Sequence, residues 1–218
     1  MNKYKIVIFD LDGTLLDTLE DIGNAVNRVL LKRGYATHPM ERYRNFIGDG
    51  SEMLVKRALP ESEASPGRVA ACLEEFMTTY EKTWDAATKP YSGIPELLDR
   101  LTLDGIRLAV LSNKPHIFTR QCVDKLLGAW TFEKVIGFSH RFPKKPDPAG
   151  ALSIVQELGM ENKDCLFIGD SGVDMQTAVA AHMFPVGAAW GFRPESELMT
   201  YGCRFLARHP LDVLSLLS

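Results

Sequence analysis

The sequence predicts an α/β fold in which a parallel sheet carries helices and a separate helical unit is inserted after the first strand. Two observations lead to this prediction. From residue 94 onward, short apolar runs alternate with segments whose apolar residues recur at helical spacing, a pattern typical of βαβ units. From about residue 18 to residue 84 the helical spacing continues without any run that resembles a strand. We therefore expect the 218 residues to build an α/β unit that is interrupted near its start by helices.

The first strand is predicted at residues 4–9, YKIVIF. This run is rich in β-branched and aromatic side chains and lacks polar alternation, so we expect it to be buried on both faces, as in a parallel sheet. Asp10 and Asp12 follow directly, and the period of two in a strand places both carboxylates on the same side. Two carboxylates held this close require a cation or a shared proton, which indicates a metal site or acid/base chemistry. An ordinary turn at the end of the strand stays open as the alternative.

The inserted segment contains two longer helices with a loop between them. Apolar residues recur at helical spacing from Leu19 to Leu30 and again from Val69 to Tyr80. The stretch NFIGDGSEMLVKRAL between them is expected to form a loop that leads into a short helix, and KPYSGIPE is expected to be a linker that returns the chain to the sheet. Because the insertion follows the first strand, we expect it beside the edge that carries the two aspartates, where it can act as a lid.

The rest of the chain alternates between helices and strands. Asp147 is expected to be the N-cap of one helix, with Pro148 as the first residue of that helix. Helices are predicted at about 95–103, 117–127, 148–158 and 173–181, and strands at 106–111, 134–138, 165–168 and near 185–189.

Composition and charge argue against several classes of protein. The net charge of −3 gives no electrostatic footprint for nucleic acid or an anionic membrane, and no apolar run approaches the roughly 20 residues of a membrane helix. The N-terminus shows no signal-peptide pattern. The five histidines are scattered and the cysteines show no C-x-x-C pairing, which argues against a zinc site or a redox pair. We expect a cytoplasmic protein with four buried free thiols, those of Cys72, Cys122, Cys165 and Cys203.

Polar residues of complementary charge follow the strands in the second half of the chain. Because the carboxyl ends of parallel strands meet at one edge of a sheet, we expect these residues to converge there. Taken singly, each has an ordinary explanation: a serine that caps a turn, an acid in the first turn of a helix, and a solvated pair of lysines. Independent accidents do not explain their common location. The residues are Ser112 and Asn113 after the strand at 106–111, Lys144 and Lys145 before the helix at 148–158, and Asp170 and Asp174 after the strand at 165–168.

These motifs resemble those of the haloacid dehalogenase superfamily, and in particular its phosphatase branch. Within that branch, FIGDGSEMLVKRAL and GDSGVDMQTA look most like phosphoglycolate phosphatases. The resemblance covers essentially the whole chain. It is carried by D-x-D-G-T at Asp10 to Thr14, Ser112, Lys145 in K-P-D-P, and G-D-S-x-x-D at Gly169 to Asp174.

The resemblance implies a Rossmann-like catalytic core at residues 1–17 and 90–218, with an α-helical cap at residues 18–89. It also implies that Asp10 is the nucleophile, which forms an aspartyl-phosphate, and that Asp12 is the general acid and base. The implied cofactor is Mg²⁺.

The family pattern gives the further roles in the core. Mg²⁺ would be held by Asp10, the backbone carbonyl of Asp12 and Asp170, while Asp174 would hold a ligating water or orient Lys145. A second set would serve the phosphoryl oxygens. That set consists of Ser112 and Lys145, with Asn113 in support, and the position before Pro146 selects Lys145 over Lys144.

The cap is expected to set the substrate. Lys56 or Arg57 could reach a substrate carboxylate, although surface charge on an amphipathic helix is the preferred interpretation. The stretch AAWGFR at residues 188–193 departs from a typical phosphoglycolate phosphatase and is interpreted as packing at the sheet edge. By family position, the cap residues that approach the leaving group are Gly48, Asp49, Gly50 and Ser51.

The resulting prediction is a Mg²⁺-dependent phosphatase that hydrolyses a small phosphomonoester, with 2-phosphoglycolate as the leading candidate. The alternatives on the same scaffold are a pyrophosphatase, a nucleotide or sugar phosphatase, and a phosphomutase. A different class, a non-enzymatic phospho-acceptor, is disfavoured because such a module would be shorter and lack a cap. A catalytically silent binding protein is disfavoured because none of the catalytic motif residues is missing. The expected partner is a small phosphorylated metabolite, not nucleic acid or a membrane, and the chain is expected to be a monomer or a homodimer.

Overall fold

The computed structural model describes residues 3–217, and its main sheet has six strands: β1 (Ile6–Phe9), β4 (Arg107–Pro115), β5 (Phe132–Phe138), β6 (Cys165–Gly169), β7 (Phe184–Ala188) and β8 (Phe205–Ala207). The strands lie in the order β5-β4-β1-β6-β7-β8. Every neighbouring pair in this order is parallel. The α/β fold with a parallel sheet is therefore confirmed.

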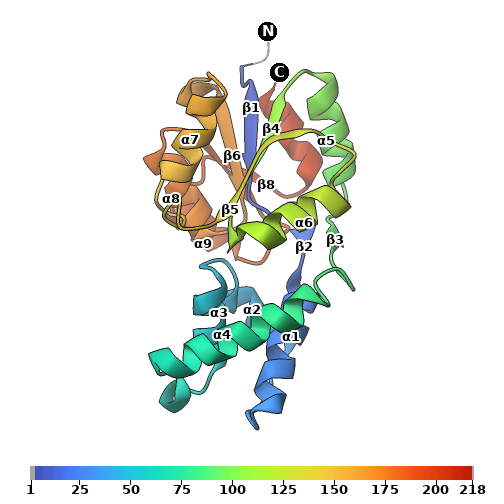
Figure 1. Cartoon of the computed structure of the whole chain (residues 1–218). Coiled ribbons are helices and arrows are strands. Elements are labelled where there is room, and N and C mark those ends of the chain that lie inside the picture. Colours follow the sequence, from blue (N-terminus) through green and yellow to red (C-terminus); the bar gives the residue numbers. More distant parts are fainter. Residues whose placement is uncertain (1–2, 218) are drawn as a thin grey trace.

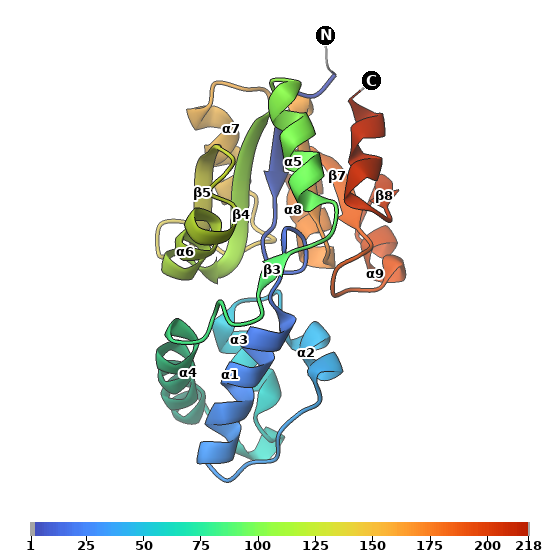
Figure 2. The same ribbon diagram turned by 90° about the vertical axis from the view of Figure 1, so that its right-hand side faces the viewer.

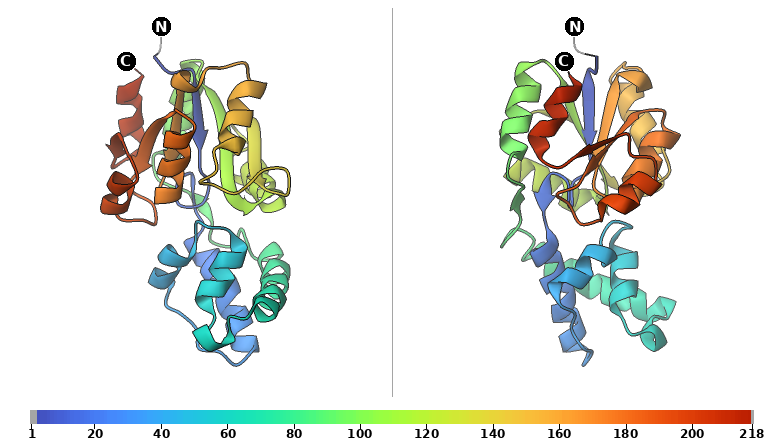
Figure 3. Two further views of the ribbon diagram at one scale, coloured as in Figure 1. Left: turned by 90° about the vertical axis from the view of Figure 1, so that its left-hand side faces the viewer. Right: turned by 180° about the vertical axis from the view of Figure 1, so that it is seen from behind.

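Helices cover both faces of this sheet, which explains why its strands lack polar alternation (Figure 3). Along β1, Ile6 and Ile8 pack into one apolar cluster, while Val7 and Phe9 pack into another on the opposite face. All four side chains are fully buried. The first face is covered by α7 (Ala149–Glu157) and α8 (Gly172–Ala180), and the second by α5 (Ile94–Leu103), α6 (His116–Leu126) and the 3-10 helix η3 (Pro210–Leu216).

A helical unit lies beyond the carboxyl ends of the sheet strands (Figures 1 and 2). An antiparallel ribbon of β2 (Leu16–Asp17) and β3 (Lys89–Pro90) joins it to the sheet. The Asp21 carboxylate accepts hydrogen bonds from the backbone N–H groups of Ala87 and Thr88 and from the Thr88 hydroxyl, which holds the returning chain beside the outgoing one. The helices of this unit are α1 (Leu19–Lys32), α2 (Met40–Phe46), α3 (Ser51–Ala58), the 3-10 helix η1 (Glu61–Glu63) and α4 (Pro66–Glu81).

The structure differs from the predicted elements in three places. The segment expected to be a linker contributes the short strand β3. Strand β4 continues past Leu111 to Pro115, so residues 112–114 belong to the strand itself. The α7 helix begins one residue later than expected, at Ala149, and the Asp147 carboxylate accepts a hydrogen bond from the Ala149 N–H at 2.9 Å.

Short elements were not predicted. A strand of three residues or a single helical turn is too brief to show a hydrophobic period. Among residues 3–217, no helix has both the length and the apolar character needed to cross a bilayer. The elements missed are β2, α2, β8, α9 (Glu195–Thr200) and the 3-10 helices η1, η2 (Asn162–Asp164) and η3.

Candidate active site

The site lies where three adjacent strands of the sheet end. Strands β4, β1 and β6 are neighbours, so Ser112 near the end of β4, Asp10 after β1 and Asp170 after β6 meet at one edge. All three side chains are buried. Gly13 allows the chain after β1 to pass close to Asp170: it has a φ of +85°, and a Cβ there would lie 2.3 Å from Asp170 Oδ2.

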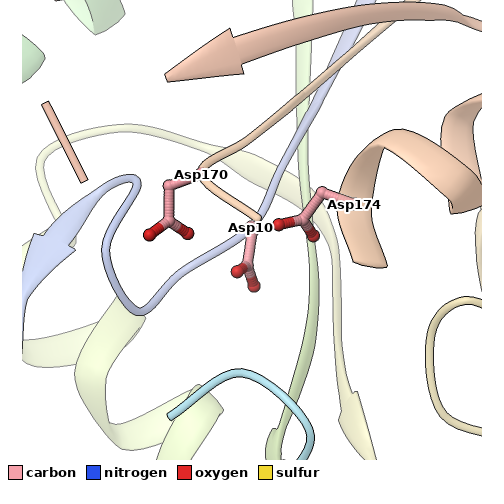
Figure 4. A group of neighbouring side chains, drawn as sticks. All are labelled: Asp10, Asp170 and Asp174. Atoms are coloured by element: carbon pink, nitrogen blue, oxygen red, sulfur yellow. The ribbon is translucent and has the colours of Figure 1, made fainter. Parts of the chain in front are cut away.

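Asp10, Asp170 and Asp174 form a buried acidic cluster (Figure 4). One carboxylate oxygen from each lies within 4.8 Å of the other two. Asp170 is held in place by the backbone N–H of Phe192, 2.7 Å from Oδ2, and by the Thr14 hydroxyl, 3.4 Å from Oδ1. Burial raises the pKa of Asp10 to about 7. Burial, together with the neighbouring carboxylates, also raises the pKa of Asp170 well above its usual range.

The chemistry of this cluster suits a hard divalent cation. Its donors are carboxylate oxygens, which bind such cations preferentially. The ammonium of Lys145 contacts two of the three acids, with Nζ 2.8 Å from Asp10 Oδ1 and 2.6 Å from Asp174 Oδ1. Three buried carboxylates and one ammonium leave an excess of negative charge, which a bound cation would neutralise. The cluster is therefore a candidate metal site.

Asp174 has two structural tasks at the start of α8. While one of its oxygens accepts from Lys145, the other accepts from the backbone N–H and the hydroxyl of Ser171, at 3.1 and 2.6 Å. The contact with the Ser171 backbone N–H is one half of the N-terminal capping box of α8, in which the Ser171 side chain also accepts from the Asp174 backbone N–H. Asp174 thus holds the Lys145 ammonium in place from a rigid helix end.

The adjacent residues Lys144 and Lys145 lie in different environments. Lys145 is buried, whereas Lys144 lies at the rim, with its ammonium 4.6 Å from the centre of the Phe138 ring. Its Nζ also lies close to Gly50 of the helical unit. Lys145 is therefore the lysine that the structure brings to the acidic cluster.

Asn113 connects the lysine loop to the helical unit. Its side chain accepts from the Lys145 backbone N–H at 2.8 Å and donates to the Lys145 carbonyl at 3.0 Å. It also donates to the Gly48 carbonyl at 3.1 Å. The neighbouring Ser112 hydroxyl accepts from the backbone N–H of Lys114 at 3.3 Å, which leaves its own hydrogen available to an oxygen in the site.

Lys114 is a site residue that was not predicted. Its side chain is 4% exposed, and its Nζ lies 3.0 Å from Asp12 Oδ1 and 2.8 Å from the Tyr80 hydroxyl oxygen, to which it donates. A signal for it exists in the sequence: if the strand is read through SNK, the period of two places Lys114 on the same side as Ser112. Because the strand was predicted to end at Leu111, Lys114 was not recognised as lying on the same side as Ser112.

A cavity lies between the sheet edge and the helical unit. On the sheet side it is lined by Asp10, Asp12, Ser112, Asn113 and Lys114, and on the helical side three of the four predicted cap residues reach it. Most of its other walls are apolar. The helical residues that line it are Ile22, Ile47, Gly48, Gly50, Ser51, Leu54, Phe76 and Tyr80.

The structure does not bring Asp49 to this cavity. Its carboxylate pairs with Arg57 Nη2 at 2.5 Å, and Arg57 also donates to the Phe46 carbonyl. Both residues line an outer crevice between the two units. Lys56 is exposed and does not line the central cavity.

Residues 189–193, here called the 189–193 loop, do more than pack at the sheet edge. The Phe192 N–H holds Asp170, and the Trp190 indole N–H donates to the Thr14 carbonyl at 3.0 Å. On its other side, Arg193 Nη2 donates to the Ile47 carbonyl at 3.0 Å. The interpretation of this stretch as edge packing is corrected, because the loop joins the acidic cluster to the helical unit.

Comparison with known proteins shows which protein family has this arrangement of residues. The family model described as haloacid dehalogenase-like hydrolase matches residues 7–188. The chain belongs to this family of hydrolases.

Relatives and solved structures place the chain more narrowly. A phosphoglycolate phosphatase of Pseudomonas putida is 34% identical over 192 residues, which cover 86% of this chain and 70% of the relative. A phosphoglycolate phosphatase of Xylella fastidiosa is 33% identical, covering 94% and 90%. A crystal structure from Lactobacillus delbrueckii subsp. bulgaricus, assigned as a phosphoglycolate phosphatase, has a TM-score of 0.92 at 30% identity and covers 99% of both chains. The chain is thus a phosphatase, that is, a phosphoric monoester hydrolase, similar to the phosphoglycolate phosphatases.

Proposed function

We propose that the protein hydrolyses 2-phosphoglycolate, or a phosphomonoester of similar size, through an aspartyl-phosphate on Asp10. The observation that carries the proposal is the division of the site into two halves beside one cavity. On one side Asp10 lies among Asp170, Asp174 and Lys145, and on the other Asp12 is paired with Lys114. Hydrolysis through a covalent intermediate needs a nucleophile and a separate proton donor at this spacing.

Asp10 is the nucleophile in this proposal. Its carboxylate lies at the end of a rigid buried strand, which fixes its direction of approach. Lys145 lies 2.8 Å from it and carries a fixed positive charge where the transferring phosphoryl oxygens would gather charge. Ser112 adds a hydroxyl donor on the same side.

Asp12 is the proposed general acid and base. It would protonate the leaving oxygen in the first step and remove a proton from the attacking water in the second. Its position two residues after Asp10 and beside the cavity brings it to the oxygen that leaves. Because the cavity is covered by the helical unit, the apolar walls would exclude water other than the one that attacks.

The proposed cofactor is Mg²⁺, held by Asp10, Asp170 and the backbone carbonyl of Asp12, with Asp174 in support. When bound, this cation would neutralise charge on the phosphoryl group and on the acids. The residues that would bind it are preorganised, because Phe192, Thr14 and Lys145 already hold the three carboxylates of the acidic cluster.

We further propose that residues 1–17 and 90–218 act as the catalytic core and residues 18–89 as its cap, and that the protein works in the cytoplasm as a monomer or a homodimer. The four cysteines are free and buried, which suits a reducing compartment.

The experiment measures phosphate release from 2-phosphoglycolate, pyrophosphate, a nucleoside monophosphate and a hexose phosphate, with Mg²⁺ or with EDTA. We expect turnover of 2-phosphoglycolate to exceed the others and to stop in EDTA. If phosphate is released faster from one of the other compounds, that compound takes the place of 2-phosphoglycolate as the proposed substrate. Conversion of a hexose phosphate into its isomer without phosphate release would contradict hydrolysis and favour a mutase.

A further inference from the structure

The pair formed by Lys114 and Tyr80 has no task in the reaction described above. Lys114 lies on β4, and Tyr80 lies near the end of α4 in the helical unit. Both are almost fully buried, and both line the central cavity. The ring of Tyr80 is fixed between Phe76, stacked at 5.4 Å between centroids, and Phe118, edge-on at 5.2 Å.

The hydrogen bonds of this pair leave donors available. The Lys114 ammonium lies 3.0 and 3.3 Å from the two oxygens of Asp12, as expected for one N–H shared between them, and a second N–H goes to the Tyr80 oxygen. The third N–H of Lys114 and the O–H of Tyr80 have no acceptor among residues 3–217. Two donors from two different units therefore lie together at the cavity.

The charge around the cavity makes this pair the place for an anion. Lys114 is the cation among the described residues that line the cavity, and the other charged side chains in that lining are Asp10 and Asp12. Ile47, Leu54 and Phe76 make the nearby walls apolar. A second negative group on a substrate would be repelled or desolvated elsewhere in the cavity, whereas Lys114 and Tyr80 offer two hydrogen bonds and a charge.

We propose that Lys114 and Tyr80 bind a carboxylate carried by the leaving group, and that they thereby select 2-phosphoacids as substrates. This inference rests on the proposed function, since it assigns the leaving group to the side of Asp12. Lys114 is then a specificity-determining residue. Because Lys114 belongs to the sheet and Tyr80 to the helical unit, a carboxylate bound by both would also join the two units.

The reach of the pair limits the length of the leaving group. The oxygen that Asp12 protonates must lie about 3 Å from that carboxylate. In a 2-phosphoacid the carboxylate oxygens lie roughly 3 Å further along, since a single methylene separates them from the leaving oxygen. Lys114 Nζ, 3.0 Å from Asp12 Oδ1, is within this reach. A 3-phosphoacid, with one more methylene, would place its carboxylate beyond the pair and against apolar wall.

The test compares 2-phosphoglycolate with its amide, which has nearly the same shape and lacks the charge. The measured quantity is the ratio of kcat/KM for the acid to kcat/KM for the amide, so a general loss of activity cancels. We expect the wild type to prefer the acid and Lys114→Met to lower the ratio by about 10- to 100-fold, as for a lost hydrogen bond to a charged group. Lys114→Arg keeps the charge and is expected to retain most of the preference.

Tyr80→Phe gives a second test that leaves the buried charges in place. We expect it to lower the same ratio by about 3- to 10-fold, mainly through KM, and it decides the question if Lys114→Met does not fold by circular dichroism. The wild type should also prefer 2-phosphoglycolate to 3-phosphopropionate.

The outcomes separate this inference from the proposed function. If the wild type prefers the acid and both Lys114→Met and Tyr80→Phe keep that preference, the carboxylate site is overturned and the phosphatase proposal stands. If Lys114→Met slows the acid and the amide equally, Lys114 serves Asp12 alone and the inference is overturned as well. A wild type that hydrolyses other phosphomonoesters without any preference for the acid overturns both the inference and the substrate.

Discussion

The two buried lysines of the site are held in different ways. Lys145 is bound by Asp10, which follows β1, and by Asp174, in the first turn of α8. Lys114 is bound by Asp12 of the same unit and by Tyr80 of the helical unit. The half of the site that would hold the phosphoryl group is thus complete within one unit, whereas the half that would hold the leaving group is completed by the other. On this account the α/β unit alone would hold the phosphoryl group, whereas the choice of substrate would depend on both units.

The largest expected effect falls on the half around Lys145. Asp10→Asn removes the proposed nucleophile and should lower turnover by about 10⁴-fold or more, because the proposed aspartyl-phosphate can then no longer form. The measurement is phosphate release from 2-phosphoglycolate, with circular dichroism to show that the fold is kept. Asp124→Asn, a matched change at an exposed acid on α6, should leave turnover unchanged. Retained activity in Asp10→Asn would remove Asp10 as the nucleophile.

A second prediction distinguishes the neighbouring lysines. Lys145→Met should lower kcat by about 10³-fold, since it removes the fixed positive charge beside the transferring group. Lys144→Met removes the same group one residue earlier, at the rim, and should change kcat by less than about 3-fold. Equal losses in the two variants would show that the position of the charge in the acidic cluster is unimportant.

A third prediction concerns the half around Lys114. Asp12→Ala should slow hydrolysis of 2-phosphoglycolate by about 10²-fold or more, because the leaving alkoxide then departs without a proton. The loss should be smaller with p-nitrophenyl phosphate, whose leaving group needs no proton. The same loss with both substrates would argue that Asp12 acts in positioning and not as an acid.

The smallest expected effect is on metal binding as a function of pH. Because the pKa of Asp10 is raised to about 7, the metal-free protein holds a proton there at lower pH, and this contribution to its stability is lost as the pH rises through about 7. Mg²⁺ must displace that proton, and the pKa of Asp170, the second proposed carboxylate ligand, is also raised, so the affinity for Mg²⁺ should rise by at least about tenfold per pH unit below pH 7. Calorimetry at pH 6 and pH 8 in two buffers measures the proton released. A flat affinity, or no proton release at pH 6, would contradict the assignment of Asp10 as a ligand.

Much of the fold follows from local pattern. The strand of β1 is buried on both faces and therefore lacks polar alternation, which is visible in the sequence. Once several strands of one parallel sheet are recognised, their carboxyl ends must share an edge, so the convergence of Asp10, Ser112 and Asp170 follows from topology. This convergence can be predicted without knowing any side-chain contact.

The contacts across the two units could not be predicted in the same way. Across the units, Lys114 donates to Tyr80, and Arg193 donates to the carbonyl of Ile47. Each contact depends on how the helical unit packs against the α/β unit, and the hydrophobic periodicity of either segment does not predict that packing. The direction of Asp49, which turns to Arg57, is likewise decided by a neighbour on the following helix.

The central claim is that Asp10 carries the phosphoryl group during turnover. The most direct measurement mixes the wild type with 2-phosphoglycolate labelled at phosphorus and Mg²⁺, stops the reaction with acid within the first turnover, and maps the label by peptide mass. The account predicts label on the peptide that contains Asp10, appearing before free phosphate and absent in Asp10→Asn. Release of phosphate with no labelled Asp10 at any time, or with label on another residue, would contradict it.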